Sequence, residues 1–247
     1  MPTKELMHIM LNAFKELSWQ ERLAMLKSYH KHNIAFSTSF GLEDQAITHA
    51  IAKMKLDISL FTLDTGRLFE ETHDVFARTN QAYPELTIHS FAPKAGDISR
   101  LIEEQGTNGF YDSYEKRLHC CHVRKVKPLK RALENVDIWL SGLRNVQSAK
   151  RGLMEVAEFD PVHRVVKLYP LIDVEDEELQ HYIAQNDIPY NILHDKHYPS
   201  IGCAPCTRAV QPGEDARAGR WWWEKETSQE CGLHMVEGKL VRATDVR

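Results

Sequence analysis

The stretch Asn33-Ile-Ala-Phe-Ser-Thr-Ser-Phe-Gly-Leu-Glu-Asp44 decides the fold of this 247-residue chain. Its first five residues form a short apolar run, which predicts a buried strand that ends in small hydroxyl residues. A glycine follows, and then apolar residues at helical spacing as far as Ile51. A strand, a small-residue turn and a helix in this order are typical of one unit of a parallel sheet covered by helices.

The same order of elements recurs along the chain. Residues 3–30 show helical spacing, with a capping pattern at Ser18-Trp-Gln-Glu21. The pattern predicts an α/β fold built on a twisted parallel sheet flanked by helices. The further elements expected are strands at 57–63, 86–90, 136–141 and 164–169, and helices at 69–78, 97–105 and 173–186.

Composition and charge limit the class of protein. The chain is 43% hydrophobic and 27% charged with a formal net charge of −4, which suits a soluble protein and argues against a general nucleic-acid binder. No apolar run reaches the length of a membrane span, and the first residues lack the pattern of a secretory signal. We therefore expect a cytoplasmic protein that binds neither nucleic acid nor membrane. Whether it forms a homo-oligomer stays open.

Two turns that follow predicted strands are candidate binding sites. Ser37, Ser39 and Gly41 precede a helix, so backbone amide groups at its positive end suit a phosphate or sulfate. The turn lacks the Gly-Lys-Ser/Thr sequence of a Walker loop, and a capped helix start without a ligand is the alternative. Asp64 opens the turn Asp64-Thr-Gly-Arg67. The carboxyl ends of parallel strands form the ligand crevice in such sheets, although a plain surface turn would have the same sequence.

The five cysteines divide into two tight pairs and one single residue. Cys120 and Cys121 are adjacent, and Cys203 and Cys206 form a Cys-x-x-Cys pair. Where thiols stay reduced, clustered cysteines more often bind metal than form disulfides. Adjacent cysteines suit a cluster of several irons better than a single zinc ion, because their side chains diverge. Buried free thiols and a redox disulfide remain as alternatives.

Cys231 is the single cysteine, and His234 follows it near the C-terminus. A thiol becomes a good nucleophile when nearby cations lower its pKa. Arg217, Arg220 and Lys125 would supply such a field if the tail folds over the crevice. We therefore interpret Cys231 as a candidate nucleophile, against the alternative of a stray thiol near a mobile end.

These stretches together resemble one known family, the assimilatory phosphosulfate reductases of cysteine biosynthesis. Within it the chain looks most like the bacterial adenylyl-sulfate reductases that carry a [4Fe–4S] cluster. Relatives that use the 3′-phosphorylated substrate typically lack both cysteine pairs. The matching stretches are Ser37-Thr-Ser-Phe-Gly-Leu-Glu-Asp44, Leu63-Asp-Thr-Gly66, Cys120-Cys121, Gly142-Leu-Arg-Asn-Val-Gln-Ser148, Cys203-Ala-Pro-Cys206, Gly219-Arg-Trp-Trp-Trp-Glu224 and Glu230-Cys-Gly-Leu-His234.

The resemblance implies an adenine-nucleotide α-hydrolase-like fold and a set of site residues. It implies that the two cysteine pairs hold the cluster, that Cys231 is the nucleophile, and that Lys125 sits between cluster and substrate. The substrate-binding set that we expect is Ser37, Ser39, Gly41, Asp64, Lys125, Arg144, Arg151, Arg217, Arg220 and His234.

The resemblance also suggests a division of the chain. We expect an N-terminal helical segment over residues 1–30 and a nucleotide-binding α/β reductase domain over residues 31–210. Residues 211–247 would form a flexible C-terminal tail that carries the catalytic cysteine.

The activity that the resemblance implies is reduction of adenosine 5′-phosphosulfate to sulfite and AMP through an S-sulfocysteine. With Cys203 and Cys206 assigned to metal, no Cys-x-x-Cys is left for an internal dithiol, so thioredoxin or glutaredoxin is the expected electron donor. Three alternatives stay open. They are reduction of the 3′-phosphorylated nucleotide, alone or as well, a zinc-stapled nucleotide-binding module without catalysis, and an ATP-dependent adenylating enzyme of the same fold.

Overall fold

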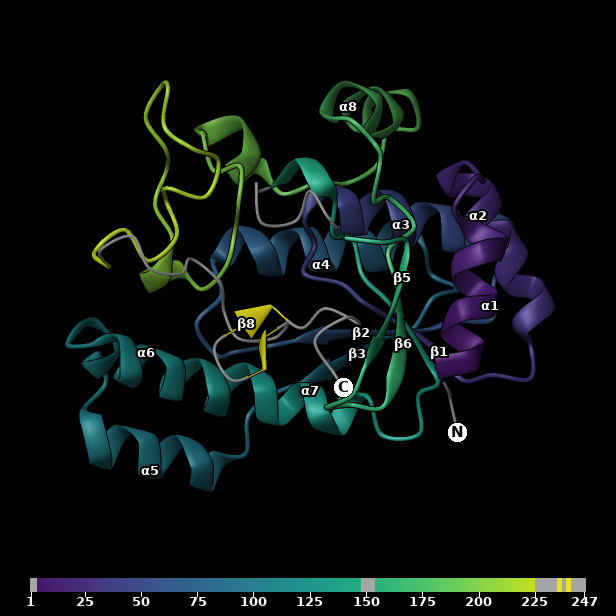
Figure 1. Ribbon diagram of the computed structural model, residues 1–247. Helices are drawn as coiled ribbons and strands as arrows, with labels where there is room; N and C mark the ends of the chain where they lie inside the picture. The colour runs from purple at the N-terminus through teal and green to yellow at the C-terminus, as the bar shows by residue number, and fades with distance from the viewer. Residues whose placement is uncertain (1–3, 148–153, 225–234, 237–238, 241–247) are drawn as a thin grey trace.

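The computed structural model describes residues 4–147 and 154–224, with the backbone of residues 235–236 and 239–240. Within these residues the centre of the fold is a six-stranded sheet in the order β3-β2-β1-β4-β6-β5 (Figure 1). All neighbours in it are parallel except β5, which pairs antiparallel with β6 at the edge. The strands are β1 (Ile34–Ser37), β2 (Ser59–Leu63), β3 (Ile88–Phe91), β4 (Ile138–Leu140), β5 (Ala157–Asp160) and β6 (Val165–Leu168), with a separate hairpin of β7 (Met235–Val236) and β8 (Lys239–Leu240).

Helices cover both faces of the sheet. In Figure 1, α3 and α4 lie above the strands and α7 lies below them, while α1 packs against β5 and β6. One turn of π-helix, His122–Val126, joins α6 to α7. The helices are α1 (Lys4–Phe14), α2 (Trp19–Met25), α3 (Leu42–Met54), α4 (Glu70–Ala82), α5 (Ala95–Gln105), α6 (Tyr114–Cys121), α7 (Lys127–Ala132) and α8 (Asp176–Gln185).

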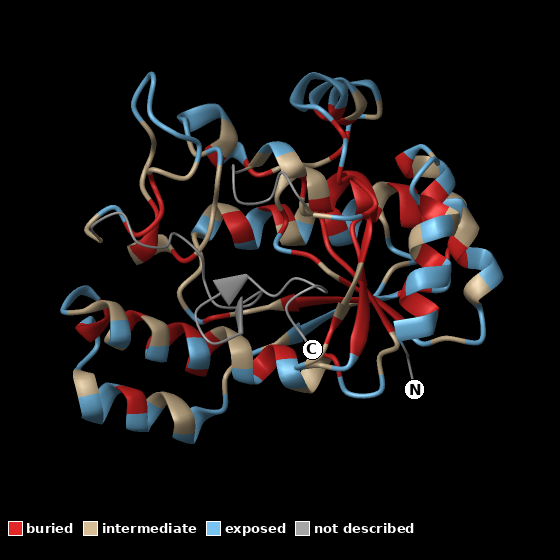
Figure 2. Cartoon of the chain, in the orientation of Figure 1, coloured by how far each residue is buried: buried red, intermediate tan, exposed pale blue. Residues whose placement is uncertain are grey.

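The strands divide the core between the two faces of the sheet, because successive side chains point to opposite sides. Ile34 and Phe36 of β1 belong to the large cluster on the α3 side. Ala35 lies between them in sequence but belongs to a second cluster with Trp139 of β4 and Leu129 of α7. Strands β1 and β4 are accordingly buried on both faces, as Figure 2 shows for the centre of the molecule. Burial on both faces is why they read as apolar runs in the sequence.

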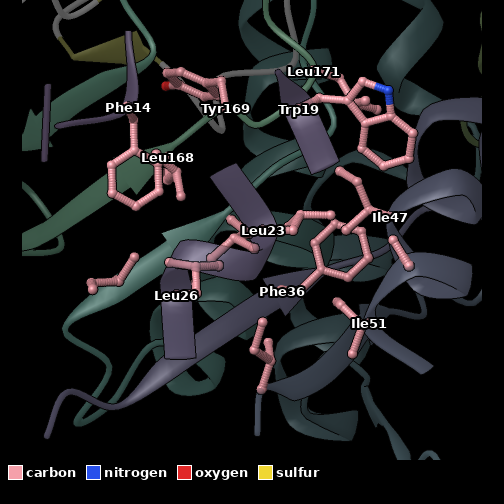
Figure 3. Close-up of a cluster of buried hydrophobic side chains, with 14 of the residues drawn as sticks. Phe14, Trp19, Leu23, Leu26, Phe36, Ile47, Ile51, Leu168, Tyr169 and Leu171 are labelled. Atoms are coloured by element: carbon pink, nitrogen blue, oxygen red, sulfur yellow. The ribbon is translucent and has the colours of Figure 1, made fainter. Parts of the chain in front are cut away.

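The N-terminal helices share the core of the sheet. Ser18 caps α2 in a reciprocal capping box, in which the Ser18 amide donates to the Glu21 carboxylate at 2.9 Å. Phe14 and Trp19 lie in the same cluster as Phe36 of β1 (Figure 3). The helical segment expected here is confirmed and consists of α1 and α2, which bury their apolar faces against the α/β layers.

The strand order places the site. From β1 the chain runs outward through β2 and β3, and then crosses back to place β4 on the other side of β1. In open parallel sheets the ligand crevice lies where the order reverses, at the carboxyl ends of the strands. The ends of β1 and β4, at Ser37 and Leu140, therefore mark the place to look for a site.

The sequence prediction of a twisted, mostly parallel α/β fold is confirmed, but the edge strand β5 was missed. Its four residues, Ala157–Asp160, alternate apolar and acidic side chains, and its pairing with β6 runs antiparallel. Such a short hairpin strand gives a weak pattern. No helix in the described part of the chain is long and apolar enough to cross a bilayer.

Candidate active site

A cavity of about 360 Å³ lies at the switch point between β1 and β4. Its volume is that of a pocket for a small organic ligand. The structure thus brings together most of the described side chains that the sequence assigned to a substrate. The predicted residues that line this cavity, which we call the nucleotide cavity, are Ser37, Ser39, Gly41, Lys125, Arg144, Arg217 and Arg220.

An aspartate of the following helix holds the turn after β1. The Asp44 carboxylate accepts hydrogen bonds from the Ser39 amide at 2.6 Å and from the Ser39 hydroxyl at 2.7 Å. Phe40 takes a positive φ of 60°, and Gly41 is the N-cap of α3. Helix α3 therefore begins at the cavity wall, where its unpaired amide groups and positive end suit an anion.

Asp44 also touches the turn after β4. A side chain at Gly142 would overlap the Asp44 carboxylate, so only glycine fits there. Asp44 is 8% exposed, and burial raises the pKa of its carboxyl to about 7 despite the hydrogen bonds from Ser39. This carboxyl thus joins the two sides of the switch point, a role that sequence reasoning missed although Asp44 closes the first motif.

Arg144 is buried, and its charge is balanced by two carboxylates. Its Nη2 lies 2.7 Å from Glu43 Oε1 and 2.6 Å from Asp176 Oδ1, and its Nη1 donates to the Val174 carbonyl at 2.9 Å. The prediction that Arg144 holds an anionic substrate group gains no support from this arrangement. Arg144 instead fixes Glu43 and Asp176 in the cavity wall. These partners lie 101 and 32 residues away, so spacing alone did not reveal the pairing.

Arg220 differs from Arg144, because no carboxylate of the described residues pairs with it. It is 6% exposed, and its Nη1 donates to the Ser200 hydroxyl at 3.1 Å. Its guanidinium lies over the Trp221 ring at 4.7 Å, and its buried Nε has no hydrogen-bond partner in the described structure. A buried cation without a counter-charge in a cavity wall is what an anionic ligand requires.

Arg217 and Asp64 take different places. Arg217 lines the nucleotide cavity, and its amide donates to Asp215 Oδ1 at 2.8 Å. Asp64 is not part of the wall, because its carboxylate caps its own turn by accepting from the Gly66 amide at 2.8 Å. The neighbouring Thr65 lines the cavity instead. This loop therefore borders the nucleotide cavity through Thr65, and the substrate role assigned to Asp64 stays a prediction.

The four cysteines of the two pairs meet in space. Cys120 and Cys121 end α6, while Cys203 and Cys206 flank a short 3₁₀ turn, and all four are buried and unbridged. They line one small space, which we call the cysteine cavity. Burial raises the pKa of the Cys120 thiol and raises that of Cys206 to about 12. Thr65 Oγ1 lies 3.3 Å from Cys203 Sγ.

This donor set fits a thiolate-bound iron–sulfur cluster. Thiolates are the usual cluster ligands, and buried thiolates need positive charge nearby. In the described part of the chain, no group of three or more His, Cys, Asp or Glu side chains is arranged to hold one metal ion. A cluster spaces its ligands more widely than a single ion does. The basic residues that line the cysteine cavity are Arg67, Arg117, Arg124 and Lys125.

Three of these basic residues were missed as site residues from the sequence. Arg117 forms a buried ion pair with Glu224, Arg124 donates to the Thr65 carbonyl at 2.7 Å, and Arg67 donates to the Thr107 carbonyl at 2.6 Å. Their signal was present but weak. Arg117 and Arg124 flank the adjacent cysteines, and Arg67 closes the turn that begins at Asp64.

Lys125 and Cys203 line both cavities, so the cysteine cavity and the nucleotide cavity share a wall. Lys125 lies in the π-helical turn between the cysteine pair and α7. Pro128 is the second residue of α7 and has no amide hydrogen to donate to the carbonyl of Arg124, which favours a widened turn at this point. Lys125 thus borders both the cysteines and the nucleotide cavity, while its expected role beside a substrate stays a prediction.

The remaining predicted site residues lie outside the described part of the chain. They are the candidate nucleophile Cys231, its neighbour His234, and Arg151. Their assignments stay predictions.

Comparison with known proteins identifies the family of the chain. The family model for the phosphoadenosine phosphosulfate reductase domain matches residues 33–209. The chain is 48% identical to an adenosine 5′-phosphosulfate reductase of Agrobacterium fabrum, over 81% of this chain and 77% of the relative. It is 45% identical to the protein of the same name from Neisseria meningitidis serogroup B, over 90% of each chain.

A solved structure has the same fold. The phosphoadenylyl-sulfate reductase of Candida auris, in complex with phosphate, superposes with a TM-score of 0.70 at 27% identity, covering 85% of this chain and 98% of that one. The matched residues 33–209 hold both cysteine pairs, the turn after β1 and Lys125, and these relatives span most of the chain. The protein therefore belongs to the phosphoadenosine phosphosulfate reductase family, with relatives of high identity among the adenosine 5′-phosphosulfate reductases.

Proposed function

We propose that the protein reduces adenosine 5′-phosphosulfate to sulfite and AMP in sulfate assimilation for cysteine biosynthesis. The observation that carries the proposal is the wall shared by the two cavities, in which Lys125 and Cys203 face both sides. Relatives at 45–48% identity are named for this substrate. The proposal places the reaction in the cytoplasm, where thiols stay reduced.

The nucleotide cavity supplies what an anionic, activated sulfate needs. The positive end of α3 at Gly41 would hold the phosphosulfate, together with Lys125, Arg217 and Arg220, the last of which pairs with no carboxylate of the described residues. The leaving group is AMP, whose departure becomes easier when cations balance the charge that develops on it.

Cys231 would act as the nucleophile. Its thiolate would attack the sulfur of the sulfate group, forming an S–S bond while the bond from that sulfur to the bridging oxygen breaks. AMP would leave with the oxygen and its electron pair, and the sulfonate would remain on Cys231 as S-sulfocysteine. His234 would lie beside this centre.

Release of sulfite requires two electrons from an outside dithiol. A donor thiolate would attack Sγ of the S-sulfocysteine and expel sulfite, leaving a mixed disulfide that the second donor thiol resolves. Cys231 would return as a thiol, and the donor would be oxidised to a disulfide. Thioredoxin or glutaredoxin has the required pair of thiols.

Cys120, Cys121, Cys203 and Cys206 would hold a [4Fe–4S] cluster. When bound, such a cluster would fix the charge distribution beside Lys125 rather than carry the two electrons. The chain's own contribution is the buried thiol set and the basic side chains around it.

One assay tests the proposal. Anaerobically purified protein is supplied with adenosine 5′-phosphosulfate and thioredoxin, and sulfite and AMP are measured together with iron and labile sulfide. The expected result is stoichiometric sulfite and AMP, with about four irons per chain. A parallel assay uses the 3′-phosphorylated nucleotide. A higher rate with that nucleotide, or iron-free protein with full activity, would contradict the proposal.

A further inference from the structure

The side-chain oxygen of Ser37 accepts a hydrogen bond from a tryptophan. Trp139 Nε1 donates to Ser37 Oγ at 2.8 Å, and both residues line the nucleotide cavity. The Ser37 hydroxyl in turn reaches the Leu140 carbonyl only at 3.5 Å, which is long for an O–H donor. Among the described residues, the Ser37 oxygen therefore has a firm donor, whereas its own hydrogen has only a weak acceptor.

The strand register explains why the indole reaches Ser37. Trp139 of β4 is the register partner of Ala35 on the parallel neighbour β1. Ala35 and Ser37 lie on the same face of β1, because side chains alternate along a strand. The small side chain of Ala35 leaves room for the indole, which extends along β1 as far as the hydroxyl at the carboxyl end. Serine at 37 and tryptophan at 139 thus form a diagonal pair across the two strands of the switch point.

The buried ion pair of Lys167 and Asp160 lies against the indole ring of Trp139. Lys167 is the register partner of Trp139 on β6, and its Nζ lies 5.0 Å from the centre of the Trp139 ring. Lys167 is itself 5% exposed, and its ammonium lies 2.6 Å from the Asp160 carboxylate. His163 Nδ1 lies 3.1 Å from the same carboxylate. A cation held over an indole is attracted to its π face, and polarisation by that cation strengthens the N–H as a donor.

The Asp160 carboxyl of this ion pair stays ionised at neutral pH. Its burial raises the pKa of the carboxyl, but the hydrogen bond from His163 and the charge of Lys167 outweigh burial and hold the pKa below its usual range. Glu158, the cross-strand partner of Lys167, is the other acidic group that faces the lysine. The Lys167 ammonium therefore contacts the Asp160 carboxylate and lies over the Trp139 ring.

We propose that Trp139 is a positioning residue that turns the Ser37 hydroxyl into a hydrogen-bond donor for an anionic oxygen of the substrate. The indole N–H occupies a lone pair of the Ser37 oxygen, so the remaining hydrogen is directed to a ligand acceptor. The pair of Lys167 and Asp160 holds the indole in place. This inference rests on the proposed function, because it names how one wall of the nucleotide cavity recognises the phosphosulfate.

A double-mutant cycle tests the proposal. Trp139→Phe keeps an aromatic ring but removes the N–H donor, and Ser37→Ala removes the acceptor. KM and kcat for adenosine 5′-phosphosulfate are measured for the wild-type protein, both single variants and the double variant. Each single variant is expected to raise KM about five- to tenfold, the loss expected for one hydrogen bond. The double variant is expected to be no worse than Ser37→Ala alone, because the two residues act through one hydroxyl.

A purely structural role for Trp139 predicts a different result. The increases in KM would then multiply in the double variant, or Trp139→Phe would leave KM unchanged, and either result would overturn the proposal. Ser37→Thr keeps the hydroxyl and is expected to restore both the wild-type KM and its sensitivity to Trp139→Phe. A Ser37→Thr protein that is indifferent to residue 139 would also refute the idea.

A second pair of substitutions covers the case in which Trp139→Phe does not fold. Lys167→Met together with Asp160→Asn removes both charges at once, so neither is left buried alone. This double substitution is expected to raise KM when residue 37 is serine and to leave KM unchanged when Ser37→Ala is also present. Equal increases in KM in the two cases would exclude the proposal. A wild-type protein that neither binds nor reduces the nucleotide would instead refute the proposed function, so the two failures are distinct.

Discussion

Arg117 and Glu224 form a bidentate ion pair across 107 residues of sequence, with Nε and Nη2 of the arginine each 2.7 Å from a carboxylate oxygen. Arg117 is fully buried on α6, the helix that ends in Cys120 and Cys121. Glu224 is the last residue of the described segment 154–224. The pair therefore holds the end of this segment against α6, the helix that carries Cys120 and Cys121.

Removing the carboxylate of this pair is expected to destabilise the fold strongly. Glu224→Gln leaves the Arg117 charge buried without its partner, which costs about 3 kcal/mol or more. Chemical unfolding measures this loss. The matched control is Glu214→Gln, because Glu214 pairs with Arg208 and both side chains are about one third exposed. Its loss is expected to stay below about 1 kcal/mol. Equal losses in the two variants would show that burial does not govern the Arg117 pair.

Asp44 is expected to make stability depend on pH. Its carboxyl pKa is raised from 3.8 to about 7 in the folded chain, chiefly by burial. The folded protein therefore holds this proton more tightly than the unfolded chain, so the contribution of Asp44 is fully present below the unfolded pKa of 3.8. That contribution falls as pH rises from there to about 7.

The variant Asp44→Asn isolates this effect. Asparagine still offers an oxygen to the Ser39 amide and hydroxyl, but it does not ionise. The difference in unfolding free energy between variant and wild type is measured at about pH 4 and about pH 8, because Asp44 in the folded protein loses its proton between these two values. The variant should gain stability relative to the wild type at the higher pH. A difference that does not change with pH would contradict the raised pKa.

Loss of Arg220 is expected to weaken substrate binding. Its guanidinium is buried in the nucleotide cavity without a carboxylate partner in the described structure. A hydrogen bond to a charged group contributes about 1.5–3 kcal/mol, so Arg220→Ala should raise KM roughly 10- to 150-fold. Arg208→Ala is the matched control, because Arg208 is neutralised by Glu214 and does not line the cavity. A comparable rise in KM in the control would refute a specific role for Arg220.

Cys203 is expected to be needed for both iron and activity, because it lines both cavities. Cys203→Ser, purified without oxygen, should lose the brown colour of an iron–sulfur protein together with sulfite production. Iron analysis and the visible absorption spectrum measure the first, and the sulfite assay measures the second. Iron absorbance at the wild-type level in this variant would count against the proposed ligand set.

Cys231 is expected to carry the covalent intermediate. Without a dithiol, wild-type protein mixed with adenosine 5′-phosphosulfate should gain the mass of one sulfonate group, and Cys231→Ser should not. Intact-protein mass spectrometry detects the adduct, and equilibrium binding checks that the variant still binds the nucleotide. An adduct that forms equally well in Cys231→Ser would exclude this residue as the nucleophile.

The elements that the sequence revealed are those with a strong local signal. The apolar run before Ser37 predicted β1, because a strand buried on both faces reads as a continuous apolar segment. The Ser18 capping box predicted the start of α2, because both of its hydrogen bonds lie within four residues. The strand β5 was missed, because its alternation of apolar and acidic side chains spans only four residues, too few for a clear strand pattern.

The roles of the arginines show where local signals end. From the sequence, Arg144 and Arg220 received the same predicted role, that of holding an anionic group of the substrate. In the structure, Glu43 and Asp176 neutralise Arg144, while no carboxylate of the described residues reaches Arg220. The partners that balance such charges lie far apart in the chain. Only the folded structure therefore distinguishes Arg144, which holds two carboxylates in the cavity wall, from Arg220, which is available to bind an anion.

The sequence by itself determined the strand–turn–helix order, the grouping of four cysteines into two close pairs, and the family that these motifs indicate. Each of these features lies within short contiguous stretches of the chain. Only the tertiary structure decided that Lys125 and Cys203 stand between two cavities, that Asp44 joins two turns, and that Trp139 reaches Ser37. The physical reason is the sheet order. Placing β4 beside β1 brings residues about 100 positions apart within hydrogen-bond distance, and no local pattern encodes that contact.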